Sequence, residues 1–214
     1  MSQRPSGSRH PIFARVYGAL APLSEVGGGA RIRQELLQGL RGSVLELGCG
    51  SGLNFRHYPR EVLRVTALEP EPQLRRLALS AARRAAVPVE LLDGVAERLP
   101  FPDGSQDAVV SALVLCSVED LAGSLFEVRR VLRPGGEFRF MEHVRGHGAG
   151  GRLEDLVDPL WTRLAGGCHL NRQSDLEVER AGLRLEGVRE LGTKALGIPI
   201  PGPRMLLGTA LAPF

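Results

Sequence analysis

Glycines at alternate positions follow a short apolar run near residue 44. The sequence from 44 to 52 reads Val-Leu-Glu-Leu-Gly-Cys-Gly-Ser-Gly, with Glu46 inside the run and Cys49 between the first two glycines. Glycine lets a backbone turn sharply and approach a ligand closely, and a helix after such a loop offers unpaired N–H groups. Leu53 stands where a dinucleotide-binding fingerprint has Gly or Ala, so the pattern disfavours a nicotinamide or flavin site.

An acidic residue, Glu69, closes the next apolar run and is followed by Pro70. In a strand-helix-strand unit, a carboxylate at the tip of the second strand accepts hydrogen bonds from the two hydroxyls of a bound ribose. Each feature alone is also typical of an ordinary connection between a strand and a helix. Together, the glycine loop and Glu69 predict a nucleoside site.

Histidines and cysteines supply the other reactive side chains. His143 closes an apolar run where the site is expected, and its imidazole could deprotonate a thiol or a phenol; His169 is a second candidate base. A histidine at a strand end is also often only a hydrogen-bonded structural residue, so both roles stay open. Cys49, Cys116 and Cys168 contain no Cys-x-x-Cys pair, and we expect neither a disulfide framework nor a metal site from them. Cys116 is expected to line the pocket as a small hydrophobe.

The elements that position these residues alternate between strands and helices. Apolar runs of strand length occupy residues 43–47, 63–68, 87–92, 107–115 and 136–141, and helical spacing of apolar residues covers 72–86 and 121–132. Near-continuous apolar strands separated by helices indicate a parallel sheet that is covered on both faces. We therefore predict an α/β fold with a doubly wound sheet that binds ligands at the carboxyl ends of its strands.

Segments on either side of this core are expected to be helical or to extend the sheet. Residues 1–42 are predicted as an N-terminal helical lid or arm, broken by glycines at 27–29, and residues 43–214 as the main domain. Within that domain, residues 145–172 are expected to form an insertion on the substrate side, which begins with a glycine-rich linker at 146–151.

The linker is predicted to lead to a helical segment and then to the stretch GGCHLNR at 166–172. Trp161, Leu160 and Leu164, with Phe13 and Tyr17 from the N-terminal arm, are candidates for an apolar lid. An amphipathic helix that covers the sheet would show the same pattern, so both readings stay open. A helix over 173–181, a strand near 183–190 and a last strand over 204–212 pairing with it are expected to complete the chain.

Composition narrows the class of protein. The 214 residues, 43% hydrophobic and 24% charged, fit one globular domain. The net charge of +3 comes from basic residues spread among acidic ones, which is typical of solvated helix faces. We expect no nucleic-acid partner, no membrane span, no secretion signal and a cytoplasmic location. The oligomeric state stays open.

At four places the chain resembles the class I S-adenosylmethionine-dependent methyltransferases, and among them the small-molecule enzymes similar to quinone-biosynthesis methyltransferases. The matching segments are VLELGCGSG at 44–52, LEP at 68–70, GVAERLPFPDGSQD at 94–107 and EVRRVLRPGG at 127–136. Three more segments resemble the methyltransferase-like group that includes animal thiol methyltransferases: LVLCSV at 113–118, FMEHV at 140–144 and GCHLNR at 167–172.

The resemblance implies a Rossmann-like seven-stranded sheet, mostly parallel with an antiparallel last strand. It also implies an enzyme that uses S-adenosylmethionine and releases S-adenosylhomocysteine. The implied cofactor-binding residues are Glu46, Gly48, Cys49, Gly50, Gly52, Glu69, Pro70, Val95, Ala96, Leu115 and Cys116. Val95 departs from the family, which commonly has Asp at this position, so we expect backbone groups at 95 and 96 to hold the adenine.

The expected activity is methyl transfer to a small, apolar acceptor through a thiol, hydroxyl, amine or activated carbon. A lipid or quinone methyltransferase at the membrane surface, with residues 12–20 as a peripheral helix, stays open as an alternative. So does a protein that binds S-adenosylmethionine without catalysis. The animal members carry an N-terminal membrane anchor, which we do not expect in this chain.

Overall fold

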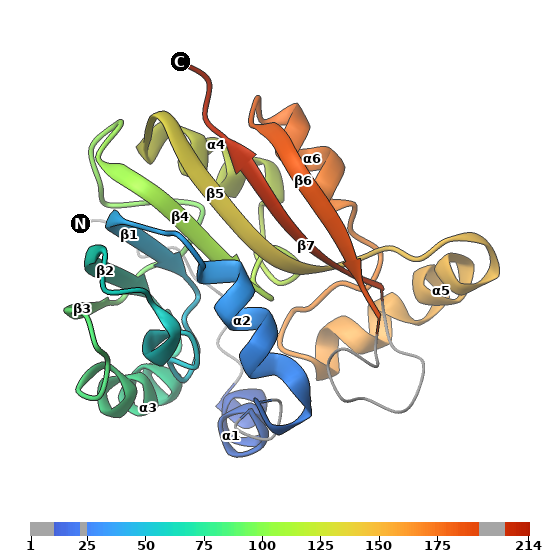
Figure 1. The fold of residues 1–214 in the computed structure, drawn as a ribbon. Helices are drawn as coiled ribbons and strands as arrows, with labels where there is room; N and C mark the ends of the chain where they lie inside the picture. The colour runs from blue at the N-terminus through green and yellow to red at the C-terminus, as the bar shows by residue number, and fades with distance from the viewer. Residues whose placement is uncertain (1–10, 22–24, 193–203) are drawn as a thin grey trace, which may run out of the picture.

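Seven strands form one mixed sheet in the order β3-β2-β1-β4-β5-β7-β6 (Figure 1). The structure, a computed structural model, describes residues 11–21, 25–192 and 204–214. Strands β1 to β5 pair with one another in parallel, whereas β7 runs antiparallel to both of its neighbours, β5 and β6. The predicted doubly wound sheet with an antiparallel last strand is therefore confirmed.

The strands are β1 Gly42–Leu47, β2 Val62–Leu68, β3 Val89–Leu92, β4 Gln106–Ala112, β5 Leu132–Val144, β6 Arg184–Leu191 and β7 Arg204–Leu211. The α-helices are α1 Pro11–Leu20, α2 Ala30–Leu37, α3 Pro72–Ala82, α4 Leu121–Val131, α5 Gly148–Leu164 and α6 Ser174–Arg180. A π-helical turn, η1 Glu25–Gly29, precedes α2, and a short 3₁₀ turn, η2 Phe55–His57, follows the glycine loop.

Two boundaries differ from the predictions in ways that affect the site. Strand β4 ends at Ala112 instead of 115, because Leu113 adopts a left-handed conformation with φ of 63° that breaks the extended chain. Helix α5 begins at Gly148, inside the stretch predicted as a glycine-rich linker. The Glu154 carboxylate accepts a hydrogen bond from the Gly146 amide at 2.6 Å, which fixes the chain just before the helix.

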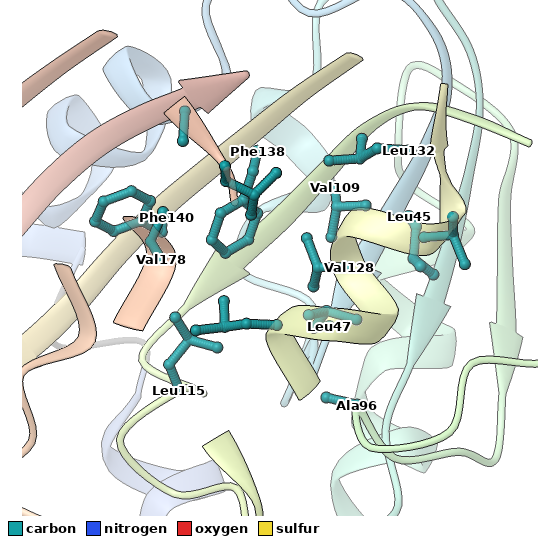
Figure 2. Close-up of a cluster of buried hydrophobic side chains, with 14 of the residues drawn as sticks. Leu45, Leu47, Ala96, Val109, Leu115, Val128, Leu132, Phe138, Phe140 and Val178 are labelled. Atoms are coloured by element: carbon teal, nitrogen blue, oxygen red, sulfur yellow. The ribbon is translucent and has the colours of Figure 1, made fainter. Parts of the chain in front are cut away.

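Apolar side chains cover both faces of the sheet, as a doubly wound fold requires. On one face, Leu45, Val109 and Phe138 pack with residues of α4 and α6 (Figure 2). On the other face, the neighbouring strand residues Val44 and Val110 pack with residues of α2 and α3. Alternate strand residues thus contribute to opposite layers of the core, so the strands are apolar almost throughout.

Strand β7 enters the sheet beside a bulky aromatic side chain. Gly208 of β7 pairs with Phe140 of β5, and a Cβ atom at position 208 would lie 2.2 Å from Phe140 Cζ. The ring therefore occupies the space of the missing side chain.

Helices α1 and α2 close one side of the molecule. Helix α1 packs against α3, where Gly18 lets the two helices approach closely beside Leu77. The glycines predicted as a break lie in the π-helical turn η1, where Gly28 has a φ of 114° and kinks the chain. This kink lets the N-terminal segment fold back over the glycine loop.

Candidate active site

The glycine loop after β1 adopts a conformation that favours glycine at every second position. Gly48, Gly50 and Gly52 have φ values of 52°, 57° and 81°, in the region that L side chains rarely adopt. At the two outer positions a side chain would also collide, with Val114 at 48 and with Phe55 at 52. The loop is therefore fixed both by its backbone and by its neighbours.

Glu69 lies just beyond the end of β2 and holds the glycine loop directly. Its carboxylate accepts hydrogen bonds from the Gly50 amide at 2.8 Å and from the Glu71 amide at 2.9 Å. The side chain is buried, and burial raises the pKa of this carboxyl. The structure thus brings the two sequence-predicted features, the loop and the acidic residue, into contact.

Glu46 supports the loop from within the sheet. Its two oxygens accept hydrogen bonds from Asn54 Nδ2 at 2.9 Å and from the Tyr58 hydroxyl at 2.7 Å. Arg33 of α2 donates to the Asn54 side chain at 2.8 Å. Burial raises the pKa of Glu46 to about 7 against these hydrogen bonds. Because both carboxylate oxygens already have protein partners, we assign Glu46 the role of holding the glycine loop in place.

Two observations show that the loop region fits a nucleoside-containing cofactor. Ser51 Oγ is buried without a hydrogen-bond partner among the described residues, so the loop presents a free polar atom. The Tyr17 ring lies against Gly50, and its hydroxyl is close enough to Glu69 and Cys116 for their charges to raise its pKa, after the larger effect of burial. Helix α1 therefore covers the space between the loop and the end of β4.

The other predicted cofactor residues lie at the same edge of the sheet. Pro70 follows Glu69 after β2, and Val95 and Ala96 follow β3, with Ala96 buried and Val95 half-buried. Leu115 and Cys116 lie in the turn after β4, not at the strand end as predicted, and both are buried. Cys49, inside the glycine loop, is also buried, and burial raises the pKa of its thiol.

A carboxylate that sequence reasoning missed fixes the turn after β4. Glu142 of β5 is fully buried and accepts hydrogen bonds from Ser111 Oγ at 2.6 Å and from the Val114 amide at 3.0 Å. Its second oxygen accepts from the Cys116 amide at 3.4 Å. The signal was present in the sequence as an acidic residue within an apolar strand.

Next to this turn, two cysteines and a histidine from three separate segments converge. Sγ of Cys116, Sγ of Cys168 and one ring nitrogen of His143 all lie within 4.8 Å of one another, and the distance from Cys168 Sγ to His143 Nδ1 is 3.7 Å. The hydrogen bond between the two thiols raises the pKa of Cys116 and lowers that of Cys168, with His143 and Trp161 adding to the second effect. Sequence analysis considered these residues singly and did not bring them together.

His169 belongs to a different pair. Its Nδ1 lies 2.8 Å from a carboxylate oxygen of Asp158 in α5, and the other oxygen of that carboxylate accepts from the Leu170 amide at 2.6 Å. The His169 amide donates to the Cys116 carbonyl at 2.8 Å, so this pair lies beside the cysteine cluster. Asp158 was also missed; it is a buried acid on a helix that otherwise exposes apolar residues.

The predicted apolar lid is only partly in place. Leu160 and Leu164 of α5 are 63% and 70% exposed, so they do not cover the sheet, and the Phe13 side chain lies outside the described residues. Trp161 is 43% exposed and contributes to the cysteine cluster instead. Figure 1 shows α5 beside the β5 and β7 end of the sheet, away from α1.

The sequence of the chain is similar to proteins of known family. Residues 45–140 match the family model described as a methyltransferase domain. This stretch of the chain therefore resembles a methyltransferase domain. The matched residues of this methyltransferase domain include the glycine loop, Glu69, Val95 and the turn after β4.

Individual relatives of the methyltransferase domain are named for several acceptors. The chain is 42% identical to thiol S-methyltransferase TMT1A of Homo sapiens over 144 residues, 65% of this chain and 59% of the relative. It is 34% identical to a demethylmenaquinone methyltransferase of Tropheryma whipplei over 94 residues, 44% of this chain and 38% of that protein. The resemblance to the thiol and quinone groups is thereby confirmed. The chain spans about 60% of the length of the thiol methyltransferase relatives.

The likeness of the methyltransferase domain extends to solved structures. A SAM-dependent methyltransferase from Aquifex aeolicus superposes with a TM-score of 0.67 at 17% identity, covering 93% of this chain and 98% of that chain. At this identity the likeness shows the fold. Among the helices that the structure describes, none is both long and apolar enough to span a bilayer.

Proposed function

We propose that the chain catalyses methyl transfer from S-adenosylmethionine to the sulfur of a small, apolar thiol. The observation that carries this proposal is the hydrogen bond from the Gly50 amide to the Glu69 carboxylate, at the same edge of the sheet as the turn at 115–117, which contains Cys116. S-adenosylmethionine supplies an activated methyl group on a sulfonium. Transfer from a sulfonium needs alignment, exclusion of water and a proton acceptor, and little more from the protein.

Cofactor binding is assigned to the edge formed by β1, β2, β3 and β4. Glu69 would accept hydrogen bonds from the ribose hydroxyls, and Gly48, Gly50 and Gly52 would allow close approach of the methionine part. Val95 and Ala96, with Pro70, would border the adenine. Cys49, Leu115 and Cys116 would line the apolar floor, while Glu46 holds the loop in register.

A thiol acceptor is favoured over the other nucleophiles by two arguments. The relatives at 42% and 40% identity are thiol S-methyltransferases. In addition, Cys116 and Cys168 form a sulfur-rich, largely buried surface beside the site, which is soft and polarizable like a thiol acceptor. We infer a small acceptor, a cytoplasmic location and no nucleic-acid partner.

Of the two candidate bases, the geometry favours His169 as proton acceptor. Asp158 occupies its Nδ1 at 2.8 Å and fixes the ring, which leaves Nε2 to receive a proton from the acceptor. His143 Nδ1 instead lies 3.7 Å from Cys168 Sγ. Any effect of His143 on the acceptor would therefore be exerted through the Cys168 thiol.

Methylation of a panel of acceptors tests the proposal. The chain is incubated with S-adenosylmethionine and equal concentrations of an alkyl thiol, the matching alcohol, the matching amine and a quinol, and the methylated products are measured by mass spectrometry. We expect the thioether as the main product, with kcat reduced in His169→Gln and restored by raising the pH. Preferred methylation of the quinol would favour the alternative function at a membrane surface.

Lack of any methylated product would point to a protein that binds the cofactor without catalysis. If S-adenosylhomocysteine raises the melting temperature but no acceptor is methylated, the chain is a cofactor-binding protein without catalysis. Addition of liposomes to the quinol reaction distinguishes a surface enzyme from one that works in solution, because only the former gains rate from the membrane.

A further inference from the structure

We propose that Cys116, His143 and Cys168 form a site for a thiophilic divalent cation, best suited to Zn²⁺, with one coordination position open for the sulfur of the acceptor thiol. The cation site itself stands on the geometry of the cluster. The role of its open position rests on the proposed function. Sequence analysis expected no metal, because the three cysteines are an odd number and contain no Cys-x-x-Cys pair.

The distances in the cluster suit a tetrahedral ion. With Zn–S bonds of about 2.3 Å and Zn–N bonds of about 2.0–2.1 Å, ligand atoms in a tetrahedron lie about 3.5–3.8 Å apart. Cys168 Sγ and His143 Nδ1 are already 3.7 Å apart, and no pair among the three ligand atoms exceeds 4.8 Å. Small side-chain rotations are therefore sufficient to close the site.

The donor set selects the kind of ion. Two thiolates and one imidazole are soft or intermediate donors, which favour zinc and disfavour magnesium and calcium. Three protein ligands with one position left open are typical of catalytic zinc sites, whereas structural sites have four. Cys116 and Cys168 are buried, and His143 is half-buried, so the open position would face the more accessible side of the cluster.

The surrounding hydrogen bonds hold the two cysteine-bearing segments together. The Cys116 carbonyl accepts from the His169 amide at 2.8 Å. The Arg172 guanidinium donates to the carbonyls of Leu115 at 2.5 Å and Val118 at 2.6 Å. These three bonds join the turn after β4 to residues 169–172. The third ligand, His143, belongs to β5. Ligands fixed in this way lose little freedom when an ion binds.

The open position would activate the acceptor for methyl transfer. A thiol that coordinates the cation loses its proton, because metal-bound thiols are thiolates; we assign that proton to His169 and then to solvent. The thiolate sulfur forms the new bond to the methyl carbon while the sulfonium sulfur-carbon bond breaks. The products are a neutral thioether and S-adenosylhomocysteine, and the oxidation state of the cation does not change.

Metal binding is tested without any activity measurement. The chain is reduced with a phosphine, stripped with a chelator and titrated with Co²⁺, whose thiolate charge-transfer absorption in the near ultraviolet reports cysteine ligation, and then with Zn²⁺ in competition. We expect one ion per chain with two thiolate ligands. Cys116→Ser, Cys168→Ser and His143→Ala should each weaken binding by at least about 100-fold, since even loss of a partner outside the ligand shell costs about 10–100-fold.

Cys49→Ser is the matched control, because it removes the one remaining cysteine of the sequence and should leave the metal affinity unchanged. Circular dichroism and the cooperative thermal unfolding of each ligand-free variant verify that it folds. Substoichiometric binding by the folded wild-type chain, or equal weakening in Cys49→Ser, overturns the site.

The outcome for the metal and the outcome for the proposed function are separable. Methylation of thiols by a metal-free, folded chain at the full rate overturns the role of the cation but leaves the methyltransferase function in place. Stoichiometric Zn²⁺ binding without methylation of any thiol overturns the proposed acceptor and keeps the metal site. Direct coordination of the acceptor is supported if an alkyl thiol shifts the Co²⁺ spectrum of wild type.

Discussion

The Glu69 carboxylate accepts a hydrogen bond from the Gly50 amide at 2.8 Å, which connects the end of β2 to the loop after β1. Both residues were singled out from the sequence, and their contact makes the loop and the acidic side chain a single structural unit. Under the proposed function, ribose binding to Glu69 would therefore be coupled to the conformation of the loop.

Replacement of Glu69 by Ala should abolish stabilisation by S-adenosylhomocysteine. At 100 times its dissociation constant the ligand adds about 2.7 kcal/mol to wild type, which corresponds to roughly 5–10 °C in Tm for a chain of this size. Differential scanning fluorimetry measures the shift. Glu90→Gln, which alters an exposed carboxylate on β3, should retain it. A full shift in Glu69→Ala would remove this residue from the cofactor site.

Introduction of Asp at position 95 should tighten cofactor binding. The new carboxylate would accept a hydrogen bond from the adenine amino group, for which about tenfold in Kd is expected from a charged hydrogen bond. Isothermal titration calorimetry with S-adenosylhomocysteine measures the change. Leu63→Asp adds the same charge at an exposed position of β2 and should have no effect. Unchanged or weaker affinity in Val95→Asp would contradict the proposed position of the adenine.

Truncation of Tyr17 to Ala should speed cofactor association, because the ring lies against Gly50 between the loop and the turn after β4. Stopped-flow fluorescence of Trp161, the only tryptophan, follows binding of S-adenosylhomocysteine. We expect an increase of several-fold in the association rate constant. Arg15→Ala, an exposed change on the same helix, is the control. Equal rates in both variants would mean that α1 is not a lid.

The free energy of unfolding should decrease as the pH rises, because Glu46 titrates at a higher pH in the folded chain than in the unfolded chain. Its pKa in the folded chain, about 7, lies above the ordinary value of 4.5. As the pH rises between these values, the unfolded chain loses the proton first, so wild type loses up to about 3 kcal/mol that is not regained at higher pH. Glu46→Gln lacks this titration and should become more stable than wild type as the pH rises from 4.5 to 8.

Urea denaturation at several pH values measures this difference. The groups that face Glu46 are Tyr58, Asn54, Arg33 and Cys49. Burial raises the pKa values of the Tyr58 hydroxyl and the Cys49 thiol, so both stay protonated over this pH range. Glu61→Gln, an exposed substitution just before β2, should leave the pH profile unchanged. A constant difference between Glu46→Gln and wild type at all pH values would refute a raised pKa.

A methyl group at position 208 should destabilise the sheet. Because the Cβ atom of Gly208→Ala would lie 2.2 Å from Phe140 Cζ, the ring or strand β7 must move. Overpacking of this kind costs about 1–3 kcal/mol or more, or several degrees in Tm. Gly187→Ala, on the neighbouring strand β6 with open space around it, should change the stability little. Equal melting temperatures would show that β7 adapts easily.

The sequence predicted the parts of the site that depend on local pattern. The alternating glycines and Glu69 follow strands recognisable by their apolar composition, and parallel strands bring their carboxyl ends together. The contacts among Cys116, His143 and Cys168 could not be predicted in this way. They depend on how residues 165–172 fold back onto the turn after β4, and no local pattern specifies that path. The burial of Asp158 appears only once the fold is known, whereas Glu142 was visible in the sequence as an acid within an apolar strand and was overlooked.

Helix α5 makes no extensive contact with another element among the residues described, and its leucines remain in water. A segment with so few neighbours opens locally at a small fraction of the free energy needed to unfold the sheet, and its amide hydrogens exchange early. When α5 unwinds, Asp158 leaves His169 and Trp161 leaves Cys168, while the glycine loop and Glu69 stay in place. The contact between the glycine loop and Glu69 is thus as durable as the whole fold, and the contacts of Asp158 and Trp161 are only as durable as one exposed helix.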